Sequence, residues 1–400
     1  MESKETFGIL EKNLGHIFEG DDLISEPNAL LTYYTDASQI AGNAKYVVFP
    51  KQIEQLRRLI ILATKQKQAL VPRGSGTDLV GSAVPEDGIV VDFSRMTKIF
   101  DFDRKNKTIT VEPGVILEKL NNYLKNFDLF FPVIPSSHNV CTIGGMVATN
   151  AAGSKAIKYG KTSDNVLEVE LLDGQGKTHT IKDASIFGTE GTIGFITKIK
   201  LELKNLPKER SLTVYTLDNL EELKNVLPEL KEKPNITAIE FVDKKSSSFL
   251  KLENKYHLIV EYDDMSGDIK EEEKIKAIWE MRESLRTVYG EKRLDIIEDP
   301  YIPEEKLPEF IEWIEMNEIP SFGHLGVGIM HLHFSSEQKR LIDKMLNITK
   351  KLGGNVSGEH GIGILKKKYL DKTEKNKIML LKQKYDPKNI MNPGKMISSW

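Results

Sequence analysis

The chain has 400 residues and a formal net charge of −3, which predicts two domains sharing one site and gives no electrostatic footprint for a nucleic-acid partner. Its single cysteine, Cys141, excludes an intramolecular disulfide, a cysteine-built zinc site and an iron–sulfur cluster held within this chain. Apolar runs fall far short of the roughly 20 residues that a spanning helix needs, so we expect a cytoplasmic protein, with peripheral attachment at the inner face of the membrane left open.

The first half of the chain alternates predicted strands and helices. A buried strand is expected at residues 46–50, then a helix over 53–65 whose apolar residues recur at helical spacing, then a short strand at 69–71. Further strands are expected at 88–93 and 108–111, followed by an amphipathic helix through Leu117, Leu120 and Leu124 and a hairpin of 167–172 with 178–181. This order predicts an α/β arrangement.

A polar break at residues 204–208 marks the expected domain boundary. We therefore divide the chain into residues 1–206 and 207–400, and expect residues 385–400 to return to the first domain. Beyond the break, predicted strands at 212–217, 238–242 and 256–262 alternate with charged helices at 220–231 and 269–289. Such alternation is typical of a small antiparallel sheet covered by helices on one face.

Three glycine-rich segments in the first half are the strongest sign of a ligand. Pro72-Arg73-Gly74-Ser75-Gly76-Thr77 follows a short apolar strand, and the segments 142–153 and 188–194 lie further along the chain. Glycine tolerates positive φ and close approach, so successive backbone N–H groups can converge on a diphosphate. Three such segments indicate a long, extended cofactor, although a single one is often only a tight turn.

Histidines cluster in the second half. His324, His331, His333 and His360 are four of the eight histidines, and Glu359 precedes the last of them. His331 and His333 share one face of a predicted strand, because side chains alternate along a strand. Two imidazoles with one carboxylate are a common set for a catalytic divalent metal. The alternative interpretation is a group of individually hydrogen-bonded histidines near a domain interface, and geometry must decide between the two.

Taken together, these motifs resemble the FAD-linked oxidase family with the vanillyl-alcohol oxidase or PCMH-type fold. The resemblance is to its D-lactate dehydrogenase, glycolate oxidase and D-2-hydroxyglutarate dehydrogenase branch and covers nearly the whole chain. It implies an α+β fold, with a two-subdomain FAD-binding domain (a βαβ subdomain and a mixed-sheet subdomain) and a ferredoxin-like antiparallel cap domain. The residues that carry it are P-R-G-S-G-T at 72–77, T-I-G-G at 142–145, N-A-A-G at 150–153, Tyr159-Gly160, G-T-E-G-T-I-G at 188–194, G-H-L-G at 323–326, S-G-E-H-G at 357–361 and N-P-G-K at 392–395.

The resemblance also implies where FAD binds. The turn at residues 73–77 would hold the pyrophosphate, residues near 136–154 would line the flavin and ribityl side, and Glu190 and Ile196 would lie nearer the adenine. Relatives with covalent flavin commonly carry a histidine in the first glycine-rich turn, which is absent here, so we expect non-covalent FAD. The expected FAD-binding residues are Pro72, Arg73, Gly74, Ser75, Gly76, Thr77, Pro135, Ser136, Thr142, Gly144, Gly145, Thr149, Asn150, Ala152, Gly153, Ser154, Tyr159, Glu190, Gly191, Gly194, Ile196 and Asn392.

For the metal-dependent members of this branch, the resemblance implies a ligand set of His324, His331 and Glu359 for Zn, Mn or Fe. His360 matches the proton-abstracting histidine. Arg282 matches the arginine that grips the substrate carboxylate, although it could instead pair with a helix neighbour such as Glu283. This chain departs from the usual G-H-x-G-D-G-N-x-H pattern at Val327 and Ile329, and His333 stands where many relatives have a polar residue that is not histidine. These departures affect the rim of the site and hence the choice of substrate.

The implied activity is oxidation of a small D-2-hydroxy acid, D-lactate first and glycolate second, to the 2-oxo acid by hydride transfer to flavin N5. The electron acceptor is expected to be a quinone, a cytochrome, an electron-transfer flavoprotein or an iron–sulfur subunit, because no second G-x-G-x-x-G unit for a nicotinamide is found. A homodimer is left open. The alternatives are a sugar-acid or aldonolactone oxidase, a flavin-dependent ether-lipid synthase, or a catalytically silent flavin-binding subunit of a multi-protein dehydrogenase.

Overall fold

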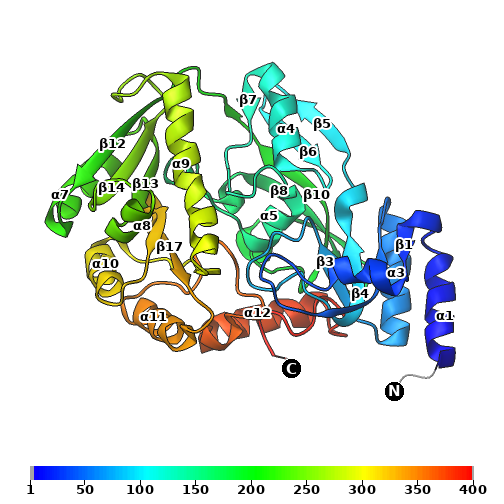
Figure 1. Ribbon diagram of the computed structural model, residues 1–400. Helices are drawn as coiled ribbons and strands as arrows, with labels where there is room; N and C mark the ends of the chain where they lie inside the picture. The colour runs from blue at the N-terminus through cyan, green and yellow to red at the C-terminus, as the bar shows by residue number, and fades with distance from the viewer. Residues whose placement is uncertain (1–3, 399–400) are drawn as a thin grey trace.

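The computed structural model describes residues 4–398, which form two halves side by side (Figure 1). The first half carries two larger sheets and a two-stranded one, and the second half carries one large sheet. None of the helices within the described residues is long and apolar enough to cross a membrane. The ligand-binding segments predicted from the sequence come from both halves, so the relation between the halves determines the site.

A four-stranded sheet opens the first half, in the order β1-β2-β4-β3. Its strands are β1 (Leu23–Ile24), β2 (Asn43–Val48), β3 (Leu70–Arg73) and β4 (Glu86–Asp92), with β2 and β3 parallel to β4. Helix α3 (Ile53–Gln66) connects β2 to β3 and, together with α1 (Lys4–Gly15), packs apolar side chains against the sheet. Short α2 (Pro27–Leu30) lies before β2. The predicted strand–helix–strand unit is present, and the first glycine-rich turn follows β3.

A five-stranded antiparallel sheet completes the first half, in the order β5-β6-β10-β8-β9. Its strands are β5 (Ile99–Asp103), β6 (Thr108–Val111), β8 (Val166–Asp173), β9 (Thr178–Ile181) and β10 (Gly194–Glu202). Helix α4 (Leu117–Leu124) places Leu117, Leu120 and Leu124 at 0% exposure in the core over this sheet, which contributes about 2 kcal/mol for each side chain. The second glycine-rich segment begins α5 (Ile143–Thr149), and α6 (Ala156–Tyr159) follows.

The second half is built on a six-stranded antiparallel sheet, here called the cap sheet, in the order β12-β14-β13-β16-β17-β15. Its strands are β12 (Ser211–Leu217), β13 (Ile236–Val242), β14 (Tyr256–Tyr262), β15 (Ile296–Glu298), β16 (Ser321–His324) and β17 (Ile329–Phe334). Strand β11 (Lys204–Asn205) precedes the cap sheet in the chain and pairs with β7 (Leu129–Phe130) of the first half. We propose that the domain boundary lies at residues 206–207, between β11 and β12.

Helices cover both faces of the cap sheet, not one face as the sequence pattern suggested. Helices α7 (Leu220–Lys231), α10 (Leu307–Met316) and α11 (Lys339–Lys351) pack on one face, against side chains such as Leu258 and Val260. Helix α9 (Glu272–Glu291) packs on the opposite face against Val242 and Ile259, next to α8 (Lys244–Phe249). The reason is that β13 and β14 carry apolar residues at successive positions, so both of their faces are buried.

The end of the chain runs back along the first half. After α12 (Lys372–Tyr385), Met391 bridges Leu70 of β3, and the backbone N–H of Asn392 donates to the carbonyl of Leu70 at 2.8 Å. The Asn392 side chain donates to the carbonyls of Ser82 and Glu190 at 2.9 and 2.8 Å. These contacts support our proposal that residues 385–398 belong with the first domain; residues 399–400 of the predicted segment lie outside the described residues.

Candidate functional site

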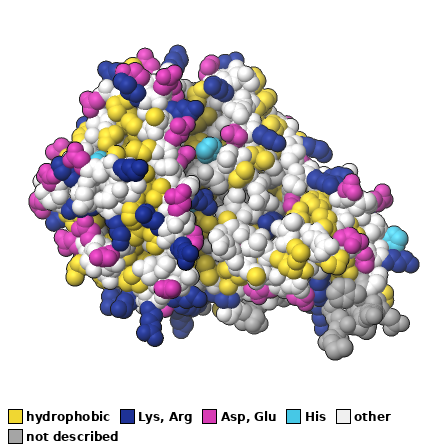
Figure 2. Space-filling view, in the orientation of Figure 1, with side chains coloured by type: hydrophobic (Ala, Val, Ile, Leu, Met, Phe, Trp, Pro, Cys, Tyr) yellow, Lys and Arg dark blue, Asp and Glu magenta, His cyan; other side chains and the backbone are white. Residues whose placement is uncertain are grey.

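A cavity of about 410 Å³ lies between the two halves. The glycine-rich segments line it from the first half, and α9, β16, β17 and the loop carrying Glu359 and His360 line it from the cap sheet side. In the space-filling view the surface is hollowed between the halves, and a histidine side chain is visible there (Figure 2). A single cavity therefore joins the predicted cofactor cradle to the histidine cluster.

Glycine is required at several positions on the cofactor side of this cavity. Gly76 and Gly191 have φ of +67° and +70°, a region that L side chains rarely adopt. A Cβ added to Gly191 would lie 2.2 Å from Pro72 Cγ, and one added to Gly74 would lie 2.4 Å from the hydroxyl of Thr142. Exposed backbone in these turns is a fitting cradle for the phosphates of FAD, because the N–H groups remain uncovered.

Most of the expected FAD-binding residues line the cavity. They are Pro72, Arg73, Gly74, Ser75, Gly76, Thr77, Pro135, Ser136, Thr142, Gly144, Gly145, Thr149, Glu190, Gly191, Gly194 and Ile196. Six others are placed elsewhere. Ala152 is fully buried in the protein, Gly153 packs against the carbonyl of Ile134, and Tyr159 makes an edge-to-face contact with Phe130 at 5.6 Å. Asn150 lines a second, smaller cavity, while Ser154 and Asn392 line neither.

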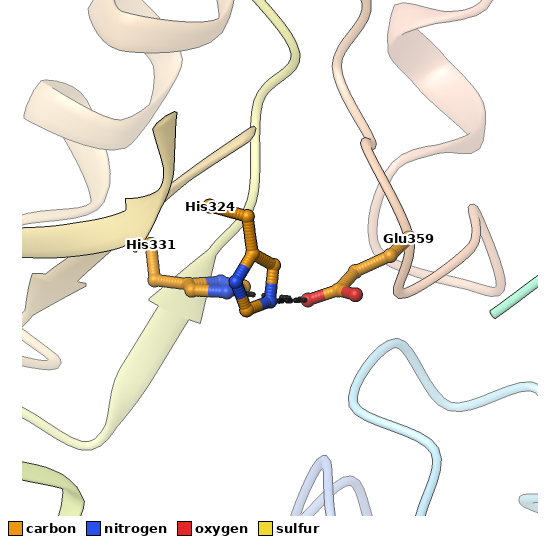
Figure 3. Close-up of side chains that lie close together, drawn as sticks. All are labelled: His324, His331 and Glu359. Carbon is orange, nitrogen blue, oxygen red and sulfur yellow. Dashed lines mark ion pairs between the residues drawn. The ribbon is translucent and has the colours of Figure 1, made fainter. Parts of the chain in front are cut away.

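His324, His331 and Glu359 come together beside the cap end of the cavity (Figure 3). His331 and Glu359 line the cavity, whereas His324 does not. Strands β16 and β17 form a hairpin whose register pairs His331 with Phe322, so both histidines emerge from one rigid element. Glu359 Oε1 lies 3.2 Å from His331 Nε2 and 3.6 Å from His324 Nε2. One ligand atom from each residue lies within 4.8 Å of the others. Two imidazole nitrogens and a carboxylate oxygen at this spacing fit a divalent metal.

Glu240 on β13 supports this group from behind. Its side chain is 0% exposed, with one oxygen on Nδ1 of His324 and the other on Nη2 of Arg282. Burial alone would raise the pKa of Glu240, but the charges of Arg282 and His324 outweigh it and lower that pKa to about 2. The Nδ1 contact fixes the ring so that Nε2 of His324 points toward Glu359.

Asp299 holds the loop that carries Glu359 and His360. Its buried carboxylate accepts the backbone N–H groups of Gly358, Glu359 and His360 at 3.1, 2.7 and 2.7 Å. The ammonium of Lys366 also binds it, and Asp299 Oδ1 lies 3.5 Å from Nδ1 of His360. Burial opposes ionisation, but His360 and Lys366 lower the pKa of Asp299 to about 2. The anionic carboxylate thus orders a glycine-bounded loop that would otherwise be flexible.

Arg282 and His333 both line the cavity but have protein partners. Arg282, on α9, pairs with Glu240 rather than with Glu283, and its guanidinium lies 4.4 Å from the centre of the Phe322 ring. His333 Nδ1 donates to the carbonyl of Leu294 at 3.1 Å, and burial lowers the pKa of His333 to about 3. His333 is therefore neutral, with its Nε2 as an acceptor.

Sequence reasoning missed Glu240, Asp299 and Arg286, the last of which also lines the cavity. An isolated glutamate inside the apolar run of β13 was a usable signal, because a buried carboxylate requires a partner. Asp299 follows a short strand and carries no comparable signal.

The solved structures that this chain resembles share its fold. The structure of p-cresol methylhydroxylase with substrate bound superimposes with a TM-score of 0.75 at 12% identity, covering 98% of this chain and 97% of that one. Alkyldihydroxyacetonephosphate synthase gives a TM-score of 0.71 at 18% identity, covering 96% and 84%. Fold and cavity thus define a protein of the PCMH-type class, with an α+β architecture of two subdomains and an antiparallel cap.

The sequence comparisons carry this assignment to a family. Residues 44–182 match the FAD binding domain, and residues 259–396 match the C-terminal domain of FAD linked oxidases. The chain belongs to the FAD-linked oxidase family. Relatives include the glycolate oxidase subunit GlcD of Bacillus subtilis (28% identity, 95% of each chain) and a D-lactate dehydrogenase of Archaeoglobus fulgidus (29%, 88% of this chain and 91% of that one). A D-2-hydroxyglutarate dehydrogenase of Stutzerimonas stutzeri is 26% identical over 96% of this chain and 97% of its own.

Proposed function

We propose that the protein is an FAD-dependent 2-hydroxyacid dehydrogenase that oxidises a small D-2-hydroxy acid to the 2-oxo acid. D-lactate is the first candidate substrate and glycolate the second. The observation that carries the proposal is the single cavity that joins a glycine-built cofactor cradle to His331, Glu359 and His360, with His324 grouped behind them. Relatives named for lactate, glycolate and 2-hydroxyglutarate support the same class of substrate.

Two bound groups would act with these residues. FAD, held non-covalently by the glycine-rich segments, would supply the acceptor for the two electrons of the oxidation. A divalent ion, Zn, Mn or Fe, would be held by His324, His331 and Glu359 and would supply a Lewis acid for the substrate hydroxyl. The donor set of two imidazoles and one carboxylate suits such an ion and leaves positions open for substrate.

The chain's own residues position the acid and take its proton. His360 is 18% exposed at the side chain, its Nδ1 lies 3.5 Å from Asp299 Oδ1, and its Nε2 lies 3.6 Å from Glu359 Oε1. Nε2 is therefore the nitrogen beside the His331 and Glu359 group, and it would accept the hydroxyl proton there. Arg282 lines the cavity and would orient the substrate carboxylate from α9. The ring of Phe322, which also lines the cavity, lies against that guanidinium. Electrons would leave for a non-nicotinamide acceptor such as a quinone, a cytochrome, an electron-transfer flavoprotein or an iron–sulfur subunit.

An anaerobic flavin-reduction screen tests the proposal. Purified protein with bound FAD is mixed with glycolate, both lactates, D-2-hydroxyglutarate and several sugar acids, and the oxidised-flavin band at about 450 nm is followed. Bleaching by a D-2-hydroxy acid is the expected result, and no bleaching with any of them would reject the proposal. Prior treatment with a chelator should abolish the reaction, whereas a metal-independent sugar-acid oxidase would keep its activity.

A further inference from the structure

Arg286 lines the same cavity as Arg282, one helical turn further along α9. Residues four apart lie on the same side of a helix, so both guanidinium groups face the site. Arg282 is 5% exposed, whereas Arg286 is exposed at the mouth of the cavity. Within the part of the chain that the structure describes, Arg286 makes no ion pair and no hydrogen bond, not even with Glu283, which lies three residues before it and also lines the cavity.

The other arginine on the cap side of the cavity already has a partner, because Arg282 is paired with the buried carboxylate of Glu240. His331 and His333 are buried and also have protein partners: His331 Nε2 lies 3.2 Å from Glu359 Oε1, and His333 Nδ1 donates to the carbonyl of Leu294 at 3.1 Å. Among the described residues, Arg286 is therefore the one arginine on the cap side of the cavity without a carboxylate partner.

We propose that Arg286 binds the carboxylate of the substrate and determines the selectivity of the site for anionic acids. This inference rests on the proposed oxidation of a 2-hydroxy acid. A guanidinium offers two parallel N–H donors to a carboxylate, and one without a protein partner gives up no existing pair when substrate arrives. Arg282 must share its charge with Glu240, so its part in carboxylate binding is the smaller one, and it also positions His324 through that shared carboxylate.

Saturation kinetics of flavin reduction test the role of Arg286. Arg286→Gln removes the positive charge, and Arg286→Lys keeps the charge but loses the two parallel N–H donors of the guanidinium. The control, Arg340→Gln on α11, removes an exposed arginine that does not line the cavity. We expect Arg286→Gln to raise the half-saturating acid concentration about 10- to 100-fold, as loss of a charged hydrogen bond does, with the limiting rate changed less than about threefold. Arg286→Lys should recover part of the affinity and Arg340→Gln should match wild type. A half-saturating concentration within about twofold of wild type in Arg286→Gln would overturn the assignment.

A binding measurement separates failure of this assignment from failure of the proposed activity. Oxalate, a non-reacting dianion, is titrated into the oxidised holoprotein, and the shift of the flavin absorbance reports its affinity. Weaker binding of oxalate by Arg286→Gln, with equal FAD content and with Arg340→Gln unchanged, supports the carboxylate-binding role even if no tested acid reduces the flavin. Equal affinity for oxalate in wild type and Arg286→Gln overturns that role, while reduction of the wild-type flavin by D-lactate leaves the proposed activity intact.

Discussion

Glu240→Gln is the substitution that most directly tests how the second half supports the site. The change keeps the shape of the side chain and removes one negative charge from a position that is 0% exposed. Two side chains lose their anionic partner in this variant: Arg282, which is 5% exposed, and His324. Removing one partner of a buried ion pair costs about 3 to 5 kcal/mol, because the remaining charge stays buried without compensation. Since Arg282 borders the cavity and gains access to water there, we expect the lower end, about 3 kcal/mol.

The same substitution should weaken metal binding by the protein. An amide oxygen is a poorer acceptor than a carboxylate, so Nδ1 of His324 is held less firmly and the ring loses part of its basicity. Loss of such a supporting contact typically reduces metal affinity about 10- to 100-fold, which corresponds to about 1.4 to 2.7 kcal/mol. Folding stability and metal affinity should therefore both decrease when this one carboxylate is removed.

Two assays measure these effects. Urea unfolding of the FAD-loaded protein gives the change in stability, and competition for Zn²⁺ with a chromophoric chelator gives the change in metal affinity. Glu273→Gln, at an exposed position in the first turn of α9, is the matched control and should alter neither quantity. A loss of stability below about 1 kcal/mol, together with unchanged Zn²⁺ affinity, would refute the view that Glu240 is a functional anchor.

Three further predictions follow from the same geometry. His360→Asn should slow flavin reduction by a factor of about 10² to 10⁴, as loss of a general base does, yet leave FAD content unchanged; unaltered turnover would reject His360 as the base. Gly191→Ala should reduce FAD content and lower the free energy of unfolding by about 1 to 3 kcal/mol. The reason is that Gly191 has a φ of +70° and the added Cβ would meet Pro72. Gly15→Ala, where no atom lies within 4 Å, is its control, and equal FAD retention by both variants would contradict the strain argument. Asp78, which directly follows the first glycine-rich turn, also lines the cavity, and its burial and the neighbouring carboxylates of Glu190 and Asp36 raise its pKa to about 8. FAD affinity, measured by release of flavin fluorescence, should therefore fall as the pH rises through 8, because the ionised side chain repels the cofactor diphosphate, and Asp78→Asn should flatten this profile.

Local periodicity was sufficient for the helices that carry a one-sided pattern. Helix α7 begins and ends at the residues predicted, and α4 contains the three leucines predicted for it, because each helix buries a single leucine stripe. Strand β14 also spans the residues predicted, although both of its faces are buried. The pattern could not show that α9 covers the second face of the cap sheet. That placement depends on pairing among distant strands, which sequence spacing does not contain. Two-residue strands such as β1 are likewise defined by their partner rather than by their own side chains.

The site likewise contains residues that nearby sequence motifs identify and residues that only the pairing of distant segments brings into place. His324 and His331 were recognisable because half of the histidines cluster near Glu359 and because the surrounding motifs resemble the family pattern. The hairpin of β16 and β17 places the two histidines on adjacent strands. Glu240 lies 84 residues before His324, and only the register of β13 with β16 brings them opposite each other. Arg286 resembles any exposed helix arginine in the sequence, and its significance comes from the neutralisation of Arg282 by that same Glu240.

The loop that carries Glu359 and His360 is fixed to both halves of the molecule by two buried carboxylates. Asp299, beside β15 of the cap sheet, binds the backbone N–H groups of residues 358–360. Glu190, from the third glycine-rich segment, binds the N–H groups of Ile362 and Gly363 at 2.5 and 2.8 Å. Glu359 is thereby tied to the hairpin of His324 and His331, while the next residues are tied to the wall of the cofactor cavity. His360 lies between these two anchors, so its position relative to the wall of the cofactor cavity is set by the backbone of one short loop and not by the packing of two large surfaces.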